Sequence, residues 1–316
     1  MTKEERILVT GGAGFIGSSV IERAIREGKD VHCLDHRNDL DNLSHLNGSV
    51  KTVNIDTRNK AGLKCFFEKY SFSGVIHLAA VSRVVWGEKD PQRCKEVNVD
   101  GTQNLLECLE ETGQNPWFIF GSSREVYGEP ASTPVKENSP KVPINIYGET
   151  KLAGEQAVRE WSVRTGNSSM ILRFSNVYGN EKDILDRVLP RFILRALKGQ
   201  PLEIHGGNQL IDFTHIDDTV EGIFRTIDYL GNGCPVHDDF HLLTGKGTTL
   251  QEVARIISDY LGQDVQLVKK DCRNYDVDRF VGEPSKAISK INFKARVKPE
   301  NGIPMTVDRF REVFLL

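Results

Sequence analysis

A glycine-rich loop near the start of the chain constrains its fold more than any other feature. The loop, Thr10-Gly11-Gly12-Ala13-Gly14-Phe15-Ile16-Gly17, follows a short apolar run, Arg6 to Thr10, and precedes a segment with helical spacing. A dinucleotide-binding loop requires this context of strand, loop and helix. Gly11 permits the tight turn, Gly14 lets the backbone approach a pyrophosphate at the helix N-terminus, and Gly17 lets the helix pack on the sheet. The loop therefore predicts a Rossmann-type fold.

Short β-branched runs alternate with helical patterns through the first half of the chain. This alternation is typical of a parallel sheet covered by helices on both faces. We predict an α/β protein with a doubly wound Rossmann domain over residues 1–175 and a smaller C-terminal α/β substrate domain over 176–316, with a return strand near Asp239 to Thr244. The predicted strands of the first half are Arg6 to Thr10, Asp30 to Asp35, Val50 to Ile55, Gly74 to Leu78, Pro116 to Gly121 and Ser169 to Phe174.

Two long helices are predicted after the first helix, which should run from Gly14 to Gly28. Pro91 to Thr112 and Ile146 to Thr165 both carry apolar residues at helical spacing. The polar, proline-rich segment Gly128 to Pro143 lies between them and is long enough to line a site.

Asp35 ends the second predicted strand about 20 residues after the glycines. A carboxylate at this place accepts hydrogen bonds from the adenosine ribose hydroxyls and repels a 2′-phosphate, so it favours NAD over NADP. His36 and Arg37 follow it directly and leave NADP as an alternative. Asp35 could also serve only as a cap at the strand end.

Tyr147 and Lys151 lie four residues apart in the second long helix, which places a phenol and an ammonium on one face. A nearby cation favours the phenolate, so the pair is suited to general-base chemistry. Ser123 follows the strand predicted at Pro116 to Gly121, at the sheet edge where α/β proteins bind ligands. Serines there often only bond the turn backbone. Together with the glycine loop, however, the three residues indicate a catalytic site.

Composition and charge exclude several classes of partner. The formal net charge is -3, so no overall positive field is present to hold nucleic acid or an anionic membrane. Six scattered cysteines without a C-x-x-C pair suit a reducing compartment, and we expect a cytoplasmic protein. No apolar run is long enough to cross a bilayer. His237 and His241 read as a turn entering a strand, so no metal site is expected.

These motifs resemble the extended short-chain dehydrogenase/reductases that act on nucleotide-sugars, typified by UDP-galactose 4-epimerase. The resemblance covers nearly the whole chain and implies NAD as cofactor, a nucleotide-sugar substrate and a homodimer formed through the two long helices. The matching segments are the glycine loop, His77-Leu78-Ala79-Ala80, Asn98 in Asn98-Val99-Asp100-Gly101-Thr102, Ser123 with Val126-Tyr127-Gly128, Tyr147 with Lys151, Arg173 to Gly179 and Asp212 to Asp218.

The resemblance also implies residue roles. Tyr147 would remove the proton of the sugar 4-hydroxyl, Ser123 would bridge to it, and Lys151 would hold both the tyrosine and the cofactor ribose. Asp56 would bond the adenine amine. The implied cofactor-binding residues are Gly11, Gly14, Phe15, Ile16, Gly17, Asp35, Asp56, Leu78, Ala79, Ala80, Asn98, Tyr147 and Lys151. The implied substrate-binding residues are Arg83, Ser123, Arg124, Asn176, Leu189 and Arg273, of which Arg273 would pair with the diphosphate.

One departure from the family pattern concerns the diphosphate. Ile211 stands where the family commonly has an arginine, so one expected contact is missing. We expect Arg187, Arg191 or Arg83 to compensate.

A second departure concerns the reaction. Glu125 looks like the catalytic glutamate of 4,6-dehydratases and uronate decarboxylases. Its neighbour Arg124 cannot donate a proton but could pair with a uronate carboxylate. We expect a nucleotide-sugar 4-epimerase that acts through a transient 4-keto sugar with hydride transfer to and from NAD. A 4,6-dehydratase or UDP-glucuronate decarboxylase using Glu125 is the alternative. A non-catalytic Rossmann protein that senses cofactor or binds RNA is a remote third.

Overall fold

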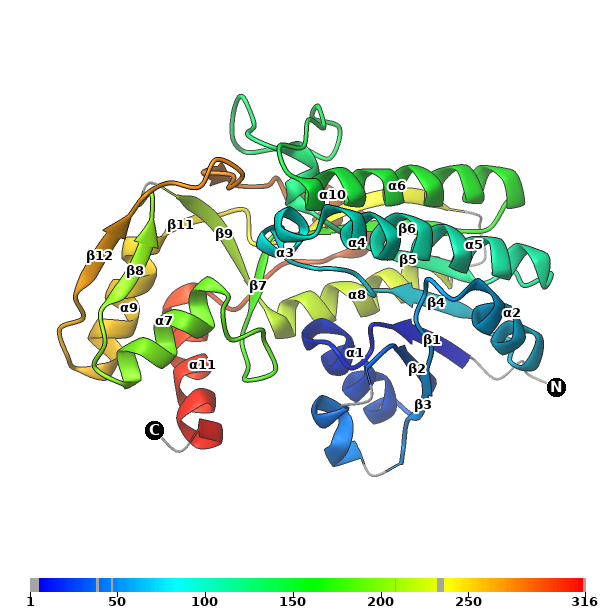
Figure 1. The fold of residues 1–316 in the computed structure, drawn as a ribbon, viewed down its shortest axis with the longest axis horizontal. Coiled ribbons are helices and arrows are strands. Elements are labelled where there is room, and N and C mark those ends of the chain that lie inside the picture. Colours follow the sequence, from blue (N-terminus) through cyan, green and yellow to red (C-terminus); the bar gives the residue numbers. More distant parts are fainter. Residues whose placement is uncertain (1–5, 38–39, 47, 208, 232–235, 315–316) are drawn as a thin grey trace. The chain divides into compact units, whose positions relative to one another are not determined.

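The computed structural model describes residues 6–37, 40–46, 48–207, 209–231 and 236–314 (Figure 1). The chain forms two compact units, each described by itself below. Unit 1 comprises residues 1–128, 141–173 and 223–240, and unit 2 comprises 129–140, 174–222 and 241–316. Among the described residues, no helix has both the length and the apolar character needed to cross a membrane.

Unit 1 is built on a seven-stranded sheet in the order β10-β6-β5-β4-β1-β2-β3. The strands β1 to β5 pair in parallel, and the order reverses at β1, which confirms the doubly wound Rossmann architecture. Their bounds are β1 Arg6–Thr10, β2 Asp30–Asp35, β3 Lys51–Asn54, β4 Gly74–His77, β5 Trp117–Ser123, β6 Ser169–Phe174 and β10 His237–Leu242.

Four strands differ from their predicted limits, and in β3 and β4 the difference is never more than one residue at an end. β5 continues through Ser123, two residues beyond the prediction, so it carries the serine itself. β10 starts and ends two residues earlier than Asp239 to Thr244. The strand stops there because the Thr244 backbone N–H donates to the Asp212 carboxylate, and Gly245 has a φ of +75° that a strand does not allow.

Helices cover the sheet of unit 1 on both faces. Arg23 of α1 lies 4.3 Å from the ring centroid of Phe224 in α8, whereas α5 packs between α2 and α6 (Figure 1). Buried apolar side chains, including Leu8, Phe118 and Trp161, fill the space between α2, α5, α6 and the sheet. The bounds are α1 Phe15–Arg26, η1 Asp41–Leu46, α2 Lys60–Lys69, α3 Val84–Lys89, α4 Pro91–Lys95, η2 Glu96–Asp100, α5 Gly101–Glu111, η3 Arg124–Tyr127, α6 Ile146–Thr165 and α8 Ile216–Leu230.

The predicted helix Pro91 to Thr112 is one helical course with a π-helical turn, η2, in its middle. Asn98 lies in that turn. Its side-chain oxygen accepts from the Val81 N–H at 2.7 Å, and its amide donates to the Thr150 hydroxyl at 2.9 Å. The widened turn thus lets one side chain join the segment after β4 to α6.

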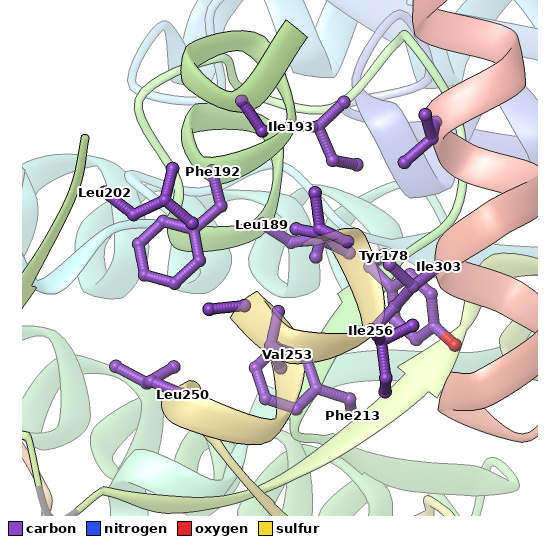
Figure 2. Close-up of a cluster of buried hydrophobic side chains, with 14 of the residues drawn as sticks. Tyr178, Leu189, Phe192, Ile193, Leu202, Phe213, Leu250, Val253, Ile256 and Ile303 are labelled. Atoms are coloured by element: carbon purple, nitrogen blue, oxygen red, sulfur yellow. The ribbon is translucent and has the colours of Figure 1, made fainter. Parts of the chain in front are cut away.

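Unit 2 has a smaller sheet and its own core. Figure 2 shows that the core lies between α7, α9, α11 and strand β9, with Phe192, Phe213 and Ile303 among its buried side chains. The elements are β7 Asn176–Tyr178, α7 Val188–Leu197, β8 Leu202–His205, β9 Leu210–His215, β11 Gly247–Thr249, α9 Leu250–Leu261, β12 Leu267–Lys270, β13 Arg279–Phe280, α10 Ser285–Ile291 and α11 Pro299–Phe314.

Candidate active site

The glycine loop packs against itself and against the end of β4. A Cβ atom added at Gly14 would lie 3.0 Å from the Gly11 carbonyl oxygen, and one at Gly17 would collide with the same oxygen. At Gly11, where φ is +67°, it would lie 2.7 Å from the Ala79 backbone nitrogen. Side chains are therefore excluded at these three glycines, as a loop that cradles a pyrophosphate requires. The same contact brings Leu78 and Ala79 beside the loop.

Asp35 lies at the end of β2, directly beside this loop. Its carboxylate accepts a hydrogen bond from the Ala13 N–H at 3.1 Å and three from Arg37, through the backbone N–H, Nε and Nη2, each at 3.1 Å. Burial alone would raise the pKa of Asp35, but hydrogen bonds and the charge of Arg37 outweigh burial and lower it. The half-exposed Arg37 side chain occupies both carboxylate oxygens, where ribose hydroxyls would bond. For Asp35 to bond the adenosine ribose of NAD, the Arg37 side chain must move away from the carboxylate.

Asp56, which we expected to bond the adenine amine, is held by a neighbouring arginine. Arg58 donates to it through Nη2 at 2.8 Å and also contacts Glu96 at 3.1 Å. The hydrogen bonds from Arg58 lower the pKa of Asp56. Asp56 therefore remains an ionised acceptor at the edge of the sheet.

Helix α6 begins with two caps that fix the position of Tyr147. The Asn145 side-chain oxygen accepts from the Gly148 N–H at 2.8 Å, and the Glu88 carboxylate accepts from the Ile146 N–H at 2.9 Å. Both groups satisfy N–H groups that a helix start leaves without partners. Neither cap was identified from the sequence, although Asn145 directly precedes the predicted helix.

Lys151 is buried one turn further along α6. Its ammonium donates to the Gly121 carbonyl at 2.8 Å and lies 6.0 Å from the Tyr147 ring centroid and 4.9 Å from that of Phe120. Burial lowers the pKa of Lys151 to about 8. The expected pairing of phenol and ammonium is therefore present, with the lysine anchored to the strand that carries Ser123.

Ser123 ends β5, and its oxygen accepts from the Glu125 N–H at 3.2 Å. This is the local turn contact that serines commonly make. The contact uses the oxygen as acceptor, so the hydroxyl hydrogen can still be donated to a ligand.

Glu125 and Arg124 are both buried, and they contact each other. One Glu125 oxygen lies 3.0 Å from the Arg124 guanidinium, and the other accepts from the Asn145 side-chain amide at 2.8 Å. Asn145 is the cap of α6. The carboxylate thus supports the start of the helix that carries Tyr147.

In unit 2, the substrate-binding candidates differ in how they are placed. Leu189 is part of the buried core, so only its backbone could meet a ligand. Arg273 pairs with Asp276 at 2.7 Å. The Nε of Arg191 is buried and has no hydrogen-bond partner among the described residues. Burial lowers the pKa of Arg191, and the charge of nearby Arg273 lowers it further, so two cations share one region.

The two remaining substrate-binding candidates, Asn176 and Arg83, lie at the starts of short elements. Asn176 begins β7, and Arg83 caps α3, with its guanidinium 5.7 Å from the Trp86 ring centroid. No cluster of three or more potential metal ligands occurs within the described ranges.

The prediction missed a group of buried polar residues in unit 1. Glu155 of α6, Arg173 of β6 and Ser122 of β5 are joined by hydrogen bonds of 2.6 to 2.8 Å. One signal was available, because Arg173 interrupts the apolar strand Ser169 to Phe174. A lone arginine inside a buried strand requires a buried partner.

Comparison with known proteins shows the family of the chain. The family described as "NAD dependent epimerase/dehydratase family" matches residues 7–235. A protein of Methanocaldococcus jannaschii named putative UDP-glucose 4-epimerase is 32% identical over 96% of this chain and 97% of its own length. The Thermotoga maritima UDP-glucose 4-epimerase, solved with UDP-glucose, has a TM-score of 0.90 and 29% identity, covering 98% of this chain and 99% of that one.

A second solved structure with the same fold belongs to an enzyme named for a different reaction. The dTDP-glucose 4,6-dehydratase DesIV of Streptomyces venezuelae, solved with NAD, also has a TM-score of 0.90, at 27% identity, covering 98% of this chain and 97% of its own. The expected family is thereby confirmed, and so is the cofactor. The chain belongs to the NAD-dependent epimerase/dehydratase family and is an enzyme that uses NAD.

Proposed function

We propose that the chain is a nucleotide-sugar 4-epimerase that inverts C4 of a UDP-hexose or a related sugar through a transient 4-keto intermediate. The observation that carries this proposal is the placement of Tyr147 and Lys151 on one face of α6, with Lys151 bonded to the Gly121 carbonyl two residues before Ser123. The relative at 32% identity, named a putative UDP-glucose 4-epimerase, supports it.

The residues of unit 1 have separate tasks in this scheme. NAD, when bound, supplies the nicotinamide that takes up the C4 hydride and returns it. Tyr147 accepts the proton of the sugar 4-hydroxyl as C4 is oxidised and gives it back when C4 is reduced. Lys151 favours the phenolate of Tyr147 by its charge. Ser123 donates its hydroxyl hydrogen to the oxygen at C4 as the carbonyl forms.

Other residues hold the cofactor without taking part in the chemistry. Gly11, Gly14 and Gly17 keep side chains away from the pyrophosphate, and the start of α1 supplies the N–H groups that favour an anion. Asp35 accepts hydrogen bonds from the adenosine ribose. Oxidation and reduction of the sugar balance over one cycle, so no external oxidant is consumed.

The contacts of Glu125 favour epimerisation over dehydration or decarboxylation. A dehydratase needs this carboxylate as a group that acts on the sugar. Here Arg124 and Asn145 engage its two oxygens, so moving Glu125 to a substrate would break both the ion pair and a bond to the cap of α6. We infer that Glu125 supports the position of Tyr147, and that Arg124 balances its charge.

In unit 2, we propose that Arg191 and Arg273 bind the nucleotide diphosphate and so replace the arginine missing at Ile211. Arg191 fits this role because its Nε is buried without a bond among the described residues. Arg187 pairs with Asp183 at 3.0 Å and Arg273 with Asp276 at 2.7 Å, so either ion pair would have to open for that arginine to bind the diphosphate. Two neighbouring guanidinium groups can pair with diphosphate oxygens in bidentate fashion.

Product analysis tests the proposal. The purified protein with NAD is incubated with UDP-glucose, UDP-galactose, UDP-glucuronate and dTDP-glucose, and the sugars are identified by NMR. We expect interconversion of the C4 epimers of a UDP-sugar. A 4-keto-6-deoxy sugar or a pentose as the accumulating product would instead establish the dehydratase or the decarboxylase.

A further inference from the structure

Four charged residues meet in unit 1, three of them buried and the fourth, Arg159, about one-third exposed. Arg173 has no exposed surface, and its Nε and Nη2 donate to the two oxygens of Glu155 at 2.8 and 2.7 Å. Its Nη2 also donates to Asp239 at 2.9 Å, and Arg159 donates to the same Asp239 oxygen at 2.9 Å. The group contains two carboxylates and two guanidinium groups, and the charge of the half-buried Lys141 interacts with all four. We call these four residues the buried ion cluster.

Stability alone does not account for the buried ion cluster. Taking ions out of water is costly, and well-packed apolar residues of similar volume often stabilise a core as well or better. Hydrogen-bonded ions can instead fix a particular geometry, because their bonds are directional. The elements that the cluster joins are therefore informative.

The cluster joins the elements that carry the site. Glu155 lies on α6, one helical turn after Lys151 and two turns after Tyr147. The Ser122 hydroxyl donates to Glu155 at 2.6 Å, and Ser122 directly precedes Ser123. Two adjacent residues of β5, Gly121 and Ser122, are thus bonded to two side chains one turn apart on α6.

We propose that Glu155 is a positioning residue that fixes α6 against the end of β5, so that Lys151 and Tyr147 keep their places relative to Ser123. Glu155 touches neither the reacting atoms nor the cofactor in this assignment. It acts through Ser122 on the strand and through its charge on the lysine. The inference rests on the proposed function only in assigning chemistry to Tyr147, Lys151 and Ser123.

The surroundings of Lys151 support a role for the carboxylate. Burial raises the pKa of the Cys94 thiol and lowers the pKa of His77 to about 3, so both are uncharged near neutral pH. Burial lowers the pKa of Lys151 to about 8, and Cys94 and the carboxylate of Glu155 oppose that effect, Cys94 more strongly than Glu155. The groups that face the lysine are the Gly121 carbonyl and Phe120 ring of β5, Cys94 of α4, His77 of β4, and Tyr147 and Glu155 of α6.

The test compares Glu155→Gln with Glu160→Gln, a matched change on the exposed face of the same helix. Lysines are labelled with ¹³C at Cε, and the Lys151 signal is identified by its loss in Lys151→Met. We expect the wild-type protein and Glu160→Gln to titrate Lys151 near the same pH. In Glu155→Gln the midpoint should move to a measurably lower pH. An unchanged midpoint in folded Glu155→Gln would overturn the electrostatic part of the proposal.

Ser122→Ala tests the geometric part and removes no charge from the core. We expect the Lys151 midpoint, the thermal midpoint and NAD affinity to stay near wild type, while turnover falls roughly 3- to 10-fold at unchanged KM. Full turnover in Ser122→Ala would overturn the geometric part. This test of the geometric part does not depend on whether Glu155→Gln folds. The lysine titration needs no substrate. Its result can therefore be interpreted even if the protein shows no epimerase activity.

Discussion

Lys151 offers a prediction whose size follows from its burial. Burial lowers the pKa of this ammonium from its ordinary value of 10.5 to about 8 in the folded protein. In the unfolded chain the pKa returns to its ordinary value. Below about pH 8 the lysine is charged in both states, and folding bears the full cost of burying the charge. Each pKa unit corresponds to 1.36 kcal/mol, so this cost is about 3 kcal/mol.

The sign of the pH dependence follows from proton binding. Between the two pKa values the unfolded chain binds more protons than the folded protein, so the free energy of unfolding rises with pH. The contribution of Lys151 should grow by roughly 2 to 3 kcal/mol between about pH 7 and about pH 10. Other groups titrate over this range, so the quantity to compare is the difference between the wild-type protein and a variant without the lysine.

Urea unfolding followed by tryptophan fluorescence measures this difference. The three tryptophans, Trp86, Trp117 and Trp161, all lie in unit 1 with Lys151, so the signal reports that unit. Lys151→Met is never charged and Lys151→Arg always is, since guanidinium does not lose its proton. The two variants should differ in absolute stability. The free energy of unfolding of the wild-type protein minus that of either variant should nevertheless rise by the same amount with pH. A difference that stays flat for both variants would refute the assigned burial cost.

Further predictions address the proposed chemistry. Tyr147→Phe should lower turnover by ~10²- to 10⁴-fold, with NAD still bound in equilibrium dialysis, and near-wild-type turnover would contradict its role as base. Glu125→Gln should keep most of the epimerase rate, whereas accumulation of reduced cofactor with an arrested sugar would favour the dehydratase. Asp35→Asn should weaken NAD about tenfold in calorimetry, and tighter binding of NADP than NAD by the wild-type protein would argue against the ribose assignment of Asp35. Light scattering should give a homodimer formed through α4, α5 and α6, and a monomer at micromolar concentration would exclude it.

Much of the fold was predictable because its signals are local. The strand, glycine loop and helix from Arg6 to Arg26 lie within one stretch of sequence, and so do Tyr147 and Lys151, one turn apart on α6. The π-helical turn at Asn98 was not predictable. Its Asn98 side chain bonds Val81, a partner 17 residues away that no local pattern indicates.

The supporting contacts of the site are nonlocal, and this is why the sequence did not reveal them. Glu155 and Ser122 are 33 residues apart, and Arg173 and Asp239 are 66 apart. Periodicity places Glu155 on the buried face of α6 but does not say which partner it meets there. The same limit applies to Glu125, whose type suggested a catalytic role but gave no sign of its bond to Asn145, 20 residues away.

The contacts of Glu125 and Glu155 together suggest how one scaffold can be restricted to a single outcome. Each carboxylate is bonded to a residue that fixes α6. Glu125 accepts from Asn145 at the start of the helix, and Glu155, two turns after Tyr147, accepts from Ser122 of β5. A carboxylate committed to such bonds is costly to withdraw, because the partner amide or hydroxyl would be left buried without an acceptor. Elimination at the sugar would require Glu125 to leave its bonds, whereas return of the proton by Tyr147 requires no rearrangement of either carboxylate. In the proposed function, this arrangement would favour restoring the C4 hydroxyl over removing a substituent elsewhere on the ring.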